Sequence, residues 1–261
     1  MSSTLYINSL RVLVLALLIM LWELASGGLY PDFELFPPLI IGRPSLIFDD
    51  LIKYVTSELF IRDLSATLQA TAWGLLIGML SGIAVGIAFH YIKFLENLFM
   101  PFLVAINSLP RPALAPLLTI WFGFGILSKI MVSWSIVFFI AFFNTLQGLK
   151  SIDPDLIKAV RVMGADRLGI MLHVSIPAVA TWVFAALRVS VSFALIGSVI
   201  GEFVGAHSGL GYRLLVSSGL FRTNLVYAIL IILMLLGVII VRVSEYVESK
   251  ILKWRPPSIM F

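Results

Sequence analysis

Long apolar runs alternate with short polar segments along this chain. Six runs are long enough for a helix that crosses a bilayer, which takes about 20 mostly apolar residues. They cover residues 10–29, 64–89, 98–122, 128–149, 178–201 and 225–245. Spanning barrel strands would alternate apolar and polar positions, and these runs do not. The pattern therefore predicts an all-α polytopic membrane protein with six transmembrane helices.

The composition supports a bilayer as the solvent of this chain. Hydrophobic residues make up 60% of the sequence and charged residues 12%, against about 45–50% and about 25% in soluble domains. The same figures exclude intrinsic disorder. A net charge of +4 is too weak to indicate a nucleic-acid partner, and without cysteine the chain has no disulfide framework and no thiolate metal site.

Charge placement predicts the orientation in the membrane. Glu23 inside the first run argues for an uncleaved helix rather than a signal peptide. Six spans put both termini on one side, and basic residues favour the cytoplasmic side. With a cytoplasmic N-terminus, ten basic residues lie in inner segments: Arg11, Lys93, Lys150, Lys158, Arg161, Arg167, Arg242, Lys250, Lys253 and Arg255. The outer segments hold six: Arg43, Lys53, Arg62, Lys129, Arg213 and Arg222.

Four glycines recur at every fourth position of the second run, at Gly74, Gly78, Gly82 and Gly86. Such a stripe of small residues lets two helix backbones approach closely. We interpret it as a packing face inside the bundle, with a pore-lining or dimer face as the alternative.

The segment between the fourth and fifth runs is charged, yet it is too apolar for a simple loop. Asp153 and Pro154 suit the start of a helix, and Gly164 suits its end. Asp166 can cap a second short helix, which we expect to end before Pro177. The first helix carries one apolar face: Leu156, Ala159, Val160 and Met163, widened by Ile157 and Val162. This face either fits a groove on a partner or packs on the protein's own inner surface.

The same segment resembles the signature loop of binding-protein-dependent ABC importer permeases. The family pattern is Glu-Ala-Ala, three residues, Gly, eleven residues, an aliphatic residue and Pro. Here Lys158-Ala159-Val160, Gly164 and Ile176-Pro177 stand at those positions. The charge of Lys158 is opposite to that of the family's Glu, so the salt bridge that the family makes there is in doubt.

Further short strings resemble the nitrate/sulfonate/taurine branch of this family, in the same order along the chain. They are Leu21-Trp22-Glu23, Pro44-Ser45, the stretch 107–117 followed by Trp121-Phe122-Gly123, Leu187-Arg188, Gly201-Glu202-Phe203 and Ser208–Tyr212.

The resemblance implies the transmembrane domain of a type I ABC importer in a bacterial inner (plasma) membrane, surrounded by lipid. A second copy would complete the pore, two cytoplasmic ATP-binding subunits would bind ATP and Mg, and a periplasmic or lipid-anchored solute-binding protein would deliver solute. This chain itself would be non-catalytic and would hold no cofactor. The coupling contacts would lie in the 154–173 loop and at its end: Leu156, Ile157, Lys158, Ala159, Val160, Met163, Gly164, Ala165, Asp166, Arg167 and Pro177.

The expected organisation has three parts. Residues 1–63 would hold the first span and an outer amphipathic segment, and residues 64–250 the core permease with its coupling loop at 150–177. Residues 251–261 would form a cytoplasmic tail. The outer segment 202–224 is rich in glycine, and we interpret it as a re-entrant or surface-lying element.

Charged groups at membrane depth are candidates for the translocation pathway. Arg188, Ser192 and Glu202 share one face of the fifth run. The alternative is that Arg188 extends to the inner interface and Glu202 marks the outer helix end. Asn107, Ser108 and Arg111 lie where prolines interrupt the third run, where a basic pore residue would suit an anion such as nitrate, taurine or a sulfonate. The alternative is an Arg111 that pairs with free carbonyl groups at a kink.

Two rival classes of function have weak signals. An intramembrane serine protease needs an activated Ser, and His207 beside Ser208 offers poor geometry for that role. A secondary transporter or channel would show inverted repeats, which the sequence does not display convincingly. Relatives in the resembled family carry nitrate, taurine, sulfonates, bicarbonate or pyrimidines, so the sequence does not name the solute.

Overall fold

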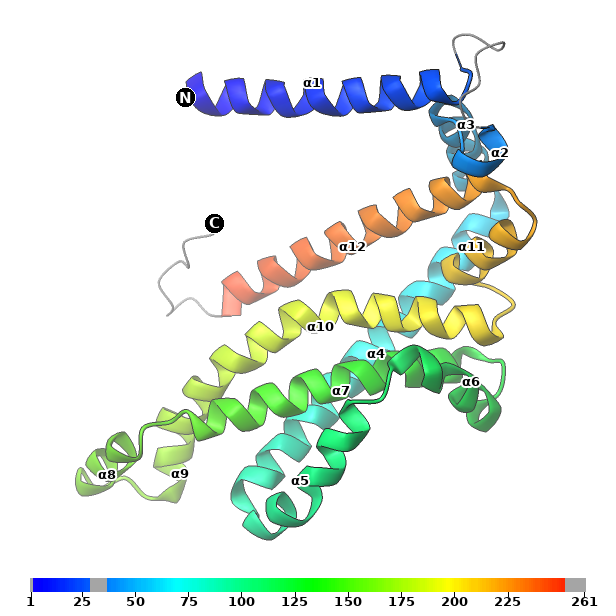
Figure 1. Cartoon of the computed structure of the whole chain (residues 1–261). Helices are drawn as coiled ribbons and strands as arrows, with labels where there is room; N and C mark the ends of the chain where they lie inside the picture. Colours follow the sequence, from blue (N-terminus) through cyan, green and yellow to red (C-terminus); the bar gives the residue numbers. More distant parts are fainter. Residues whose placement is uncertain (1, 29–36, 252–261) are drawn as a thin grey trace.

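The computed structural model describes residues 2–28 and 37–251, and the regular elements in these ranges are helices (Figure 1). Five helices are long and apolar enough to span a membrane: α1 (Ser2–Ala25), α4 (Glu58–Tyr91), α7 (Ile126–Lys150), α10 (Ile176–Gly205) and α12 (Thr223–Ile251). Between them lie α2 (Pro38–Ile41), α3 (Pro44–Val55), α5 (Lys93–Asn107), α6 (Arg111–Phe122), α8 (Pro154–Val162), α9 (Arg167–Ile170), the π-helical turn η1 (Met171–Ser175) and α11 (Leu210–Gly219). The expected tail lies outside the described residues from position 252 onward.

The third predicted span, over 98–122, is broken where prolines interrupt its sequence, as expected. This stretch forms two helices, α5 and α6, that meet at an angle of 100°. Pro110 is the N-cap of α6 and Pro112 follows within its first turn. Proline lacks the N–H that a continuing helix needs and clashes with the carbonyl four residues earlier, so the helix stops near Ser108 and restarts in a new direction. Six spans are present if this bent pair counts as one broken span.

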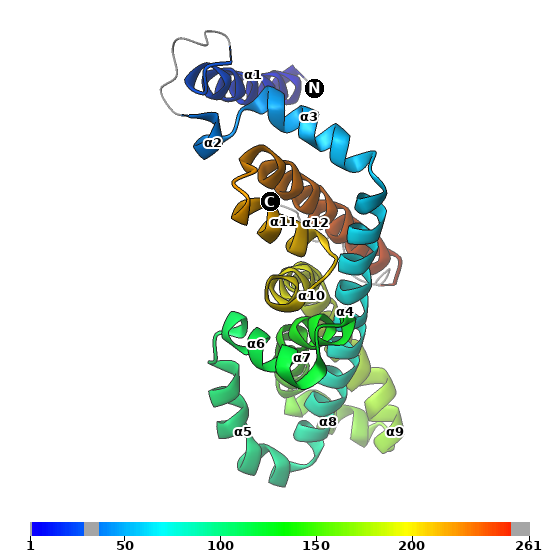
Figure 2. The same cartoon turned by 90° about the vertical axis from the view of Figure 1, so that its right-hand side faces the viewer.

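The centre of the bundle is the contact of α4 with α7 and α10. The two views show α7 and α10 side by side, with α4 crossing them and α12 on the far side of α10 (Figures 1 and 2). The glycine stripe of α4 faces α7, where a Cβ at Gly78 would lie 2.7 Å from Val137 and one at Gly82 would lie 2.5 Å from the Phe138 carbonyl oxygen. The packing interpretation of the stripe is therefore confirmed, because the two backbones touch where only glycine fits.

The bundle has two distinct ends. Helix α8 lies at one end, at the left in Figure 1, and the first turns of α1 and the last turns of α12 point toward the same side. The α3, α6 and α11 segments gather toward the opposite end. We call these the α8 end and the α11 end.

Small apolar clusters fix the peripheral helices to the centre. Tyr54, Leu210, Ile229 and Ile232 join α3, α11 and α12 at the α11 end. Nearer the α8 end, residues of α5 pack on a buried cluster of α4 and α7. Helix α5 itself has no buried residue, so it lies on the bundle rather than in it.

Candidate functional site

Helix α8 has the ends that its sequence predicts. The Asp153 carboxylate accepts a hydrogen bond from the Asp155 N–H at 2.8 Å, which confirms the N-cap. At the other end Gly164 has a φ of +93°. Its N–H donates to the Arg161 carbonyl at 3.0 Å, and the Ala165 N–H donates to the Val160 carbonyl at 3.2 Å. These two bonds form a Schellman motif, which needs the left-handed conformation that glycine reaches freely.

The apolar side chains of α8 are open to the surroundings. Val162 is 89% exposed, Met163 85% and Leu156 50%, while Ile157 and Val160 are half-buried and Ala159 is exposed. The helix has no buried residue, and its main neighbour is the short helix α9. No other part of residues 2–28 and 37–251 therefore buries this face, and an apolar patch of this kind is typical of a protein interface.

Lys158 lies in solvent on the same helix. Its ammonium group pairs with the Asp155 carboxylate at 2.8 Å, and both side chains are more than two-thirds exposed. Such a pair contributes little to stability, so both groups are free to meet an outside partner.

The chain does not break at Pro177, which corrects the expected end of the second short helix. The Asp166 carboxylate caps α9 by accepting from the Gly169 N–H at 2.7 Å. Helix α9, which starts at Arg167, then leads through η1 directly into α10, with Pro177 in the first turn of α10. The Ile176 N–H reaches back five residues to the Met171 carbonyl. This wider turn precedes the proline, whose missing N–H is harmless at the start of a new helix.

At the bend of α5 and α6, Arg111 bonds to the end of α5. Its guanidinium donates to the Asn107 side-chain oxygen at 2.9 Å and to the Asn107 carbonyl at 3.3 Å, and it lies over the Phe139 ring at 4.5 Å. Asn107 and Ser108 are exposed, and Arg111 is half-buried. Arg111 thus pairs with a carbonyl that the bend leaves free, and within the described residues it has no acidic partner.

Arg188 does have an acidic partner. Its guanidinium pairs with the Glu248 carboxylate of α12 at 2.8 Å, near the α8 end of that helix. Ser192 is half-buried one turn further along α10.

Glu202 lies in a buried polar cluster at the α11 end. It is 1% exposed, and its carboxylate accepts from the Thr67 hydroxyl and from the Gly211 N–H, both at 2.7 Å. Asp63 is fully buried and accepts from the Gly209 N–H at 3.1 Å. Two buried carboxylates thus bind N–H groups at the start of α11, where the helix dipole favours negative charge.

Two further side chains complete this cluster around Asp63. The Arg213 guanidinium pairs with the Asp63 carboxylate at 2.8 Å, and the Tyr54 hydroxyl donates to it at 2.9 Å. Burial and the neighbouring carboxylate both raise the pKa of the Tyr54 phenol, so it remains a hydrogen-bond donor at neutral pH. The glycine-rich segment that includes α11 is therefore docked on α4 and α10 by its polar groups.

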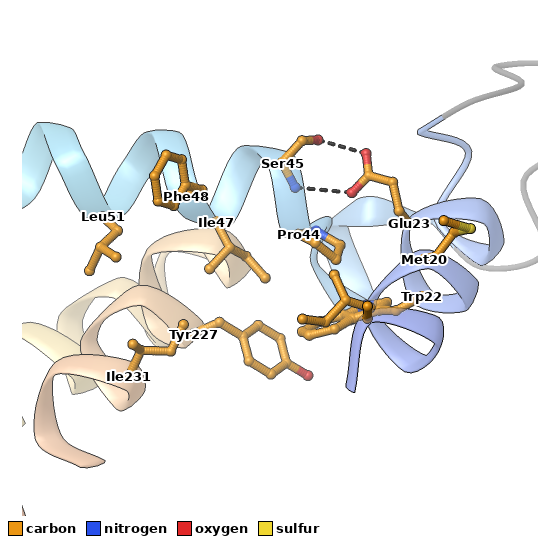
Figure 3. A pocket seen from close by; sticks show the side chains of 12 residues that line it. Met20, Trp22, Glu23, Pro44, Ser45, Ile47, Phe48, Leu51, Tyr227 and Ile231 are labelled. Atoms are coloured by element: carbon orange, nitrogen blue, oxygen red, sulfur yellow. Dashed lines mark hydrogen bonds between the residues drawn. The ribbon is translucent and has the colours of Figure 1, made fainter. Parts of the chain in front are cut away.

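An apolar groove of about 850 Å³ runs between α1, α3 and α12 (Figure 3). Its polar groups are engaged at the rim, where the Glu23 carboxylate accepts from the Ser45 hydroxyl at 2.7 Å and from the Ser45 N–H at 3.0 Å. Trp22 packs edge-on against Tyr227 beside it. The groove is thus the place where α1 attaches to the rest of the chain, and its Glu23 and Ser45 side chains are engaged in that attachment.

Comparison with known proteins identifies the family. Residues 74–253 match the binding-protein-dependent transport system inner membrane components. The chain belongs to this family. A putative aliphatic sulfonates transport permease of Bacillus subtilis is 31% identical over 245 residues, which cover 94% of this chain and 87% of that protein. A formylaminopyrimidine transport permease of Halalkalibacterium halodurans is 30% identical over 239 residues, which cover 92% and 93%.

Solved structures agree on the fold. A chain of a bacterial ABC transporter that imports alginate has a TM-score of 0.65 at 17% identity and covers 95% of this chain and 96% of its own length. A chain of the methionine transporter MetNI has a TM-score of 0.64 at 20% identity and covers 74% and 97%. The chain therefore has the fold of a type I ABC importer transmembrane domain. Its family makes it a permease component, and its relatives are non-catalytic membrane subunits rather than secondary transporters or proteases.

Sequence reasoning missed the acidic partners at both ends of the bundle. Asp63 directly precedes the second run, and with Asp49, Asp50 and Glu58 nearby no pattern in the sequence distinguishes it. The isolation of Glu96 in the sequence could have marked it as a residue that needs a basic partner, because no other Asp or Glu occurs between Asp63 and Asp153.

Proposed function

We propose that this chain is the permease subunit of an ATP-driven importer and that α8 is its coupling helix. The single observation that carries the proposal is the uncovered apolar end of α8 at Val162 and Met163, which lies outside the apolar spans. A cytoplasmic ATP-hydrolysing subunit with an apolar groove would bury this face, and its acidic groups would suit Lys158. Two such subunits, with ATP and Mg, would serve the complex.

We further propose that two copies of the chain enclose the translocation pathway. Asn107 and Ser108 are exposed at a break within an apolar helix pair. Irregular backbone at membrane depth is tolerated where protein or a water-filled cavity covers it, and not against lipid. A second copy across a pathway would supply that cover, with a solute-binding protein delivering solute at the α11 end.

The proposed solute is a small anion such as nitrate, taurine or a sulfonate. Arg111 at the break supports this choice, since its charge is not neutralised by an acid within the described residues. The relatives named for aliphatic sulfonates and for formylaminopyrimidine fit a small polar solute.

The coupling role is tested by purification of the chain with its cognate ATPase. Met163→Asp places a charge on the docking face, and we expect it to weaken ATPase binding by about tenfold or more. Gly164→Val cannot adopt a φ of +93° without strain, which costs roughly 1–3 kcal/mol locally. A Cβ at Gly164 meets nothing within 4 Å, so the defect of Gly164→Val would come from the backbone.

Two controls accompany these variants. Gly164→Asn tolerates a positive φ better than valine does, so it should retain most of the ATPase binding. Leu220→Asp changes an exposed apolar residue after α11, and we expect it to leave the ATPase bound. Full ATPase binding and normal ATP turnover by both Met163→Asp and Gly164→Val would overturn the coupling assignment.

A further inference from the structure

Glu96 is the sole acidic residue between Asp63 and Asp153, and it joins two helices at the α8 end. It lies in the first turn of α5 with its side chain 14% exposed. One of its carboxylate oxygens pairs with the Lys93 ammonium at 3.2 Å, and the other pairs with the ammonium of Lys150 on α7. Burying a carboxylate in such an apolar stretch costs free energy unless a cation pairs with it. The two lysines supply that pairing and stabilise Glu96 at this position.

Lys150 is held at the base of α8. It is the last residue of α7, and three residues separate it from Pro154, where α8 begins. That connector is short and bonded, because the Ser151 hydroxyl donates to the Gly148 carbonyl at 2.9 Å and Asp153 caps α8. A movement of α8 along or across the bundle would therefore carry Lys150 with it.

On the other side of the ion pair, Glu96 lies in the first turn of the broken helix pair. Helix α5 packs Leu95, Met100 and Leu103 against a cluster of buried residues on α4 and α7. It has no buried residue of its own, so this face and the ion pair are what hold it. Helix α5 then leads to the bend at Arg111.

We propose that the Glu96–Lys150 ion pair is a positioning contact that transmits movements of α8 to the broken pair α5–α6. The inference rests on the proposed coupling role of α8. The other route out of α8 runs through α9 and η1 into α10. Apart from the ion pair, α5 meets α7 through its apolar face on Phe142 and Leu146, one to two turns before Lys150, and α6 packs on α7 and α10. The ion pair is the polar contact of α5 at the last residue of α7, next to α8. Through this contact, a movement of α8 that the docked ATPase causes would reach α5 and, through the bend, Arg111 at the start of α6.

A purely structural role predicts a different outcome. Glu96 lies near the N-terminus of α5 and Lys150 near the C-terminus of α7, and both positions favour those charges. If the pair did no more than this, its loss would lower stability and leave the motion of α6 intact. The decisive readout is therefore a nucleotide-driven movement of α6 in complexes that still hold the ATPase.

The cysteine-free chain allows this movement to be measured directly. Ile120 on α6 is 79% exposed, and Ile120→Cys carries a spin label in each of the two copies of the complex with the cognate ATPase. The distance between the labels is measured with and without ATP and vanadate. We expect a shift in the parent complex, and a drop of about threefold or more in the fraction of complexes that shift in Glu96→Gln or Lys150→Gln. Both variants should co-purify with the ATPase normally.

A matched control and a rescue separate the ion pair from local structure. Lys93→Gln removes the exposed partner of Glu96 and leaves Lys150 in place, so the shift should persist. The exchanged pair Glu96→Lys with Lys150→Glu should restore part of it, because the carboxylate at 150 can pair with lysines at 93 and 96 although both charges then oppose the helix dipoles.

An unchanged shift in Glu96→Gln overturns the inference, as does a loss of the shift in Lys93→Gln or in the exchanged pair. Failure of the unmodified chain to hold the ATPase would instead refute the proposed function, and the two failures are thus distinguishable.

Discussion

At the scale of single residues, the two arginines at membrane depth differ in their partners. Arg188 forms an ion pair with Glu248, whereas Arg111 bonds to the neutral Asn107 and lies over Phe139. A paired guanidinium has little net charge to offer a solute, and an unpaired one attracts anions. The geometry therefore favours Arg111 over Arg188 as the residue that meets an anionic solute.

We expect Arg111→Gln to lower the uptake of an anionic solute by about tenfold per assembled complex. This is the lower end of the increase in association rate that a cleft lined by charge of one sign gives to an oppositely charged ligand. Arg111→Lys keeps the charge and should retain part of the uptake. The matched control is Arg188→Gln together with Glu248→Gln, which removes an ion pair without leaving a buried charge, and it should transport almost normally. Uptake of labelled taurine, nitrate and a sulfonate, normalised to co-purified ATPase, checks the prediction. The reverse ranking of the two changes would favour Arg188.

At the scale of elements, the contact of α4 with α7 depends on the absence of side chains at the glycine stripe. Gly82→Ala would place a Cβ 2.5 Å from the Phe138 carbonyl oxygen. The Phe138 carbonyl belongs to the helix backbone and cannot move aside as the end of a flexible side chain can. The two helices would therefore have to separate. We expect a loss of about 1–3 kcal/mol, typical of overpacking.

The matched control for this prediction is Gly219→Ala in α11. A Cβ at Gly219 meets nothing within 4 Å, and alanine favours helices over glycine by up to about 1 kcal/mol. Gly219→Ala should therefore be neutral or slightly stabilising. Thermal unfolding of the two variants in detergent, followed by loss of the monodisperse protein, measures the difference. Equal stability of the two would show that the α4–α7 contact relaxes more easily than its geometry indicates.

Elements set by local chemistry could be predicted from the sequence. The apolar runs predicted the spans, and Asp153 and Gly164 predicted both ends of α8, because capping depends on residues within one turn. Prolines indicated the break near Arg111, but a 100° bend also depends on the packing of α5 and α6 on α7, which no local pattern contains. The turn before Pro177 was mispredicted for a similar reason, since a π-helical turn is one of several ways to admit a proline.

Contacts between distant residues were out of reach of the sequence pattern. Asp63 and Arg213 are 150 positions apart, and their pairing follows from how α11 folds back onto α4. The same holds for Glu96 and Lys150, which meet because α5 packs on a cluster shared by α4 and α7. A single sequence shows that such charges are unusual in an apolar chain, and the fold shows which of them meet.

At the scale of the whole molecule, α8 and α11 lie at opposite ends of the bundle, so labelling at two positions tests the orientation (Figure 1). The excess of basic residues in the segments on the α8 side predicts that this end faces the cytoplasm, together with both termini. In the cysteine-free chain, Asp155→Cys on α8 should react with a membrane-impermeant maleimide in inside-out vesicles and remain unlabelled in intact cells. Ser218→Cys on α11 is exposed and should show the reverse pattern. Labelling of position 155 from outside intact cells would reverse the topology, and the ATPase could not then reach α8.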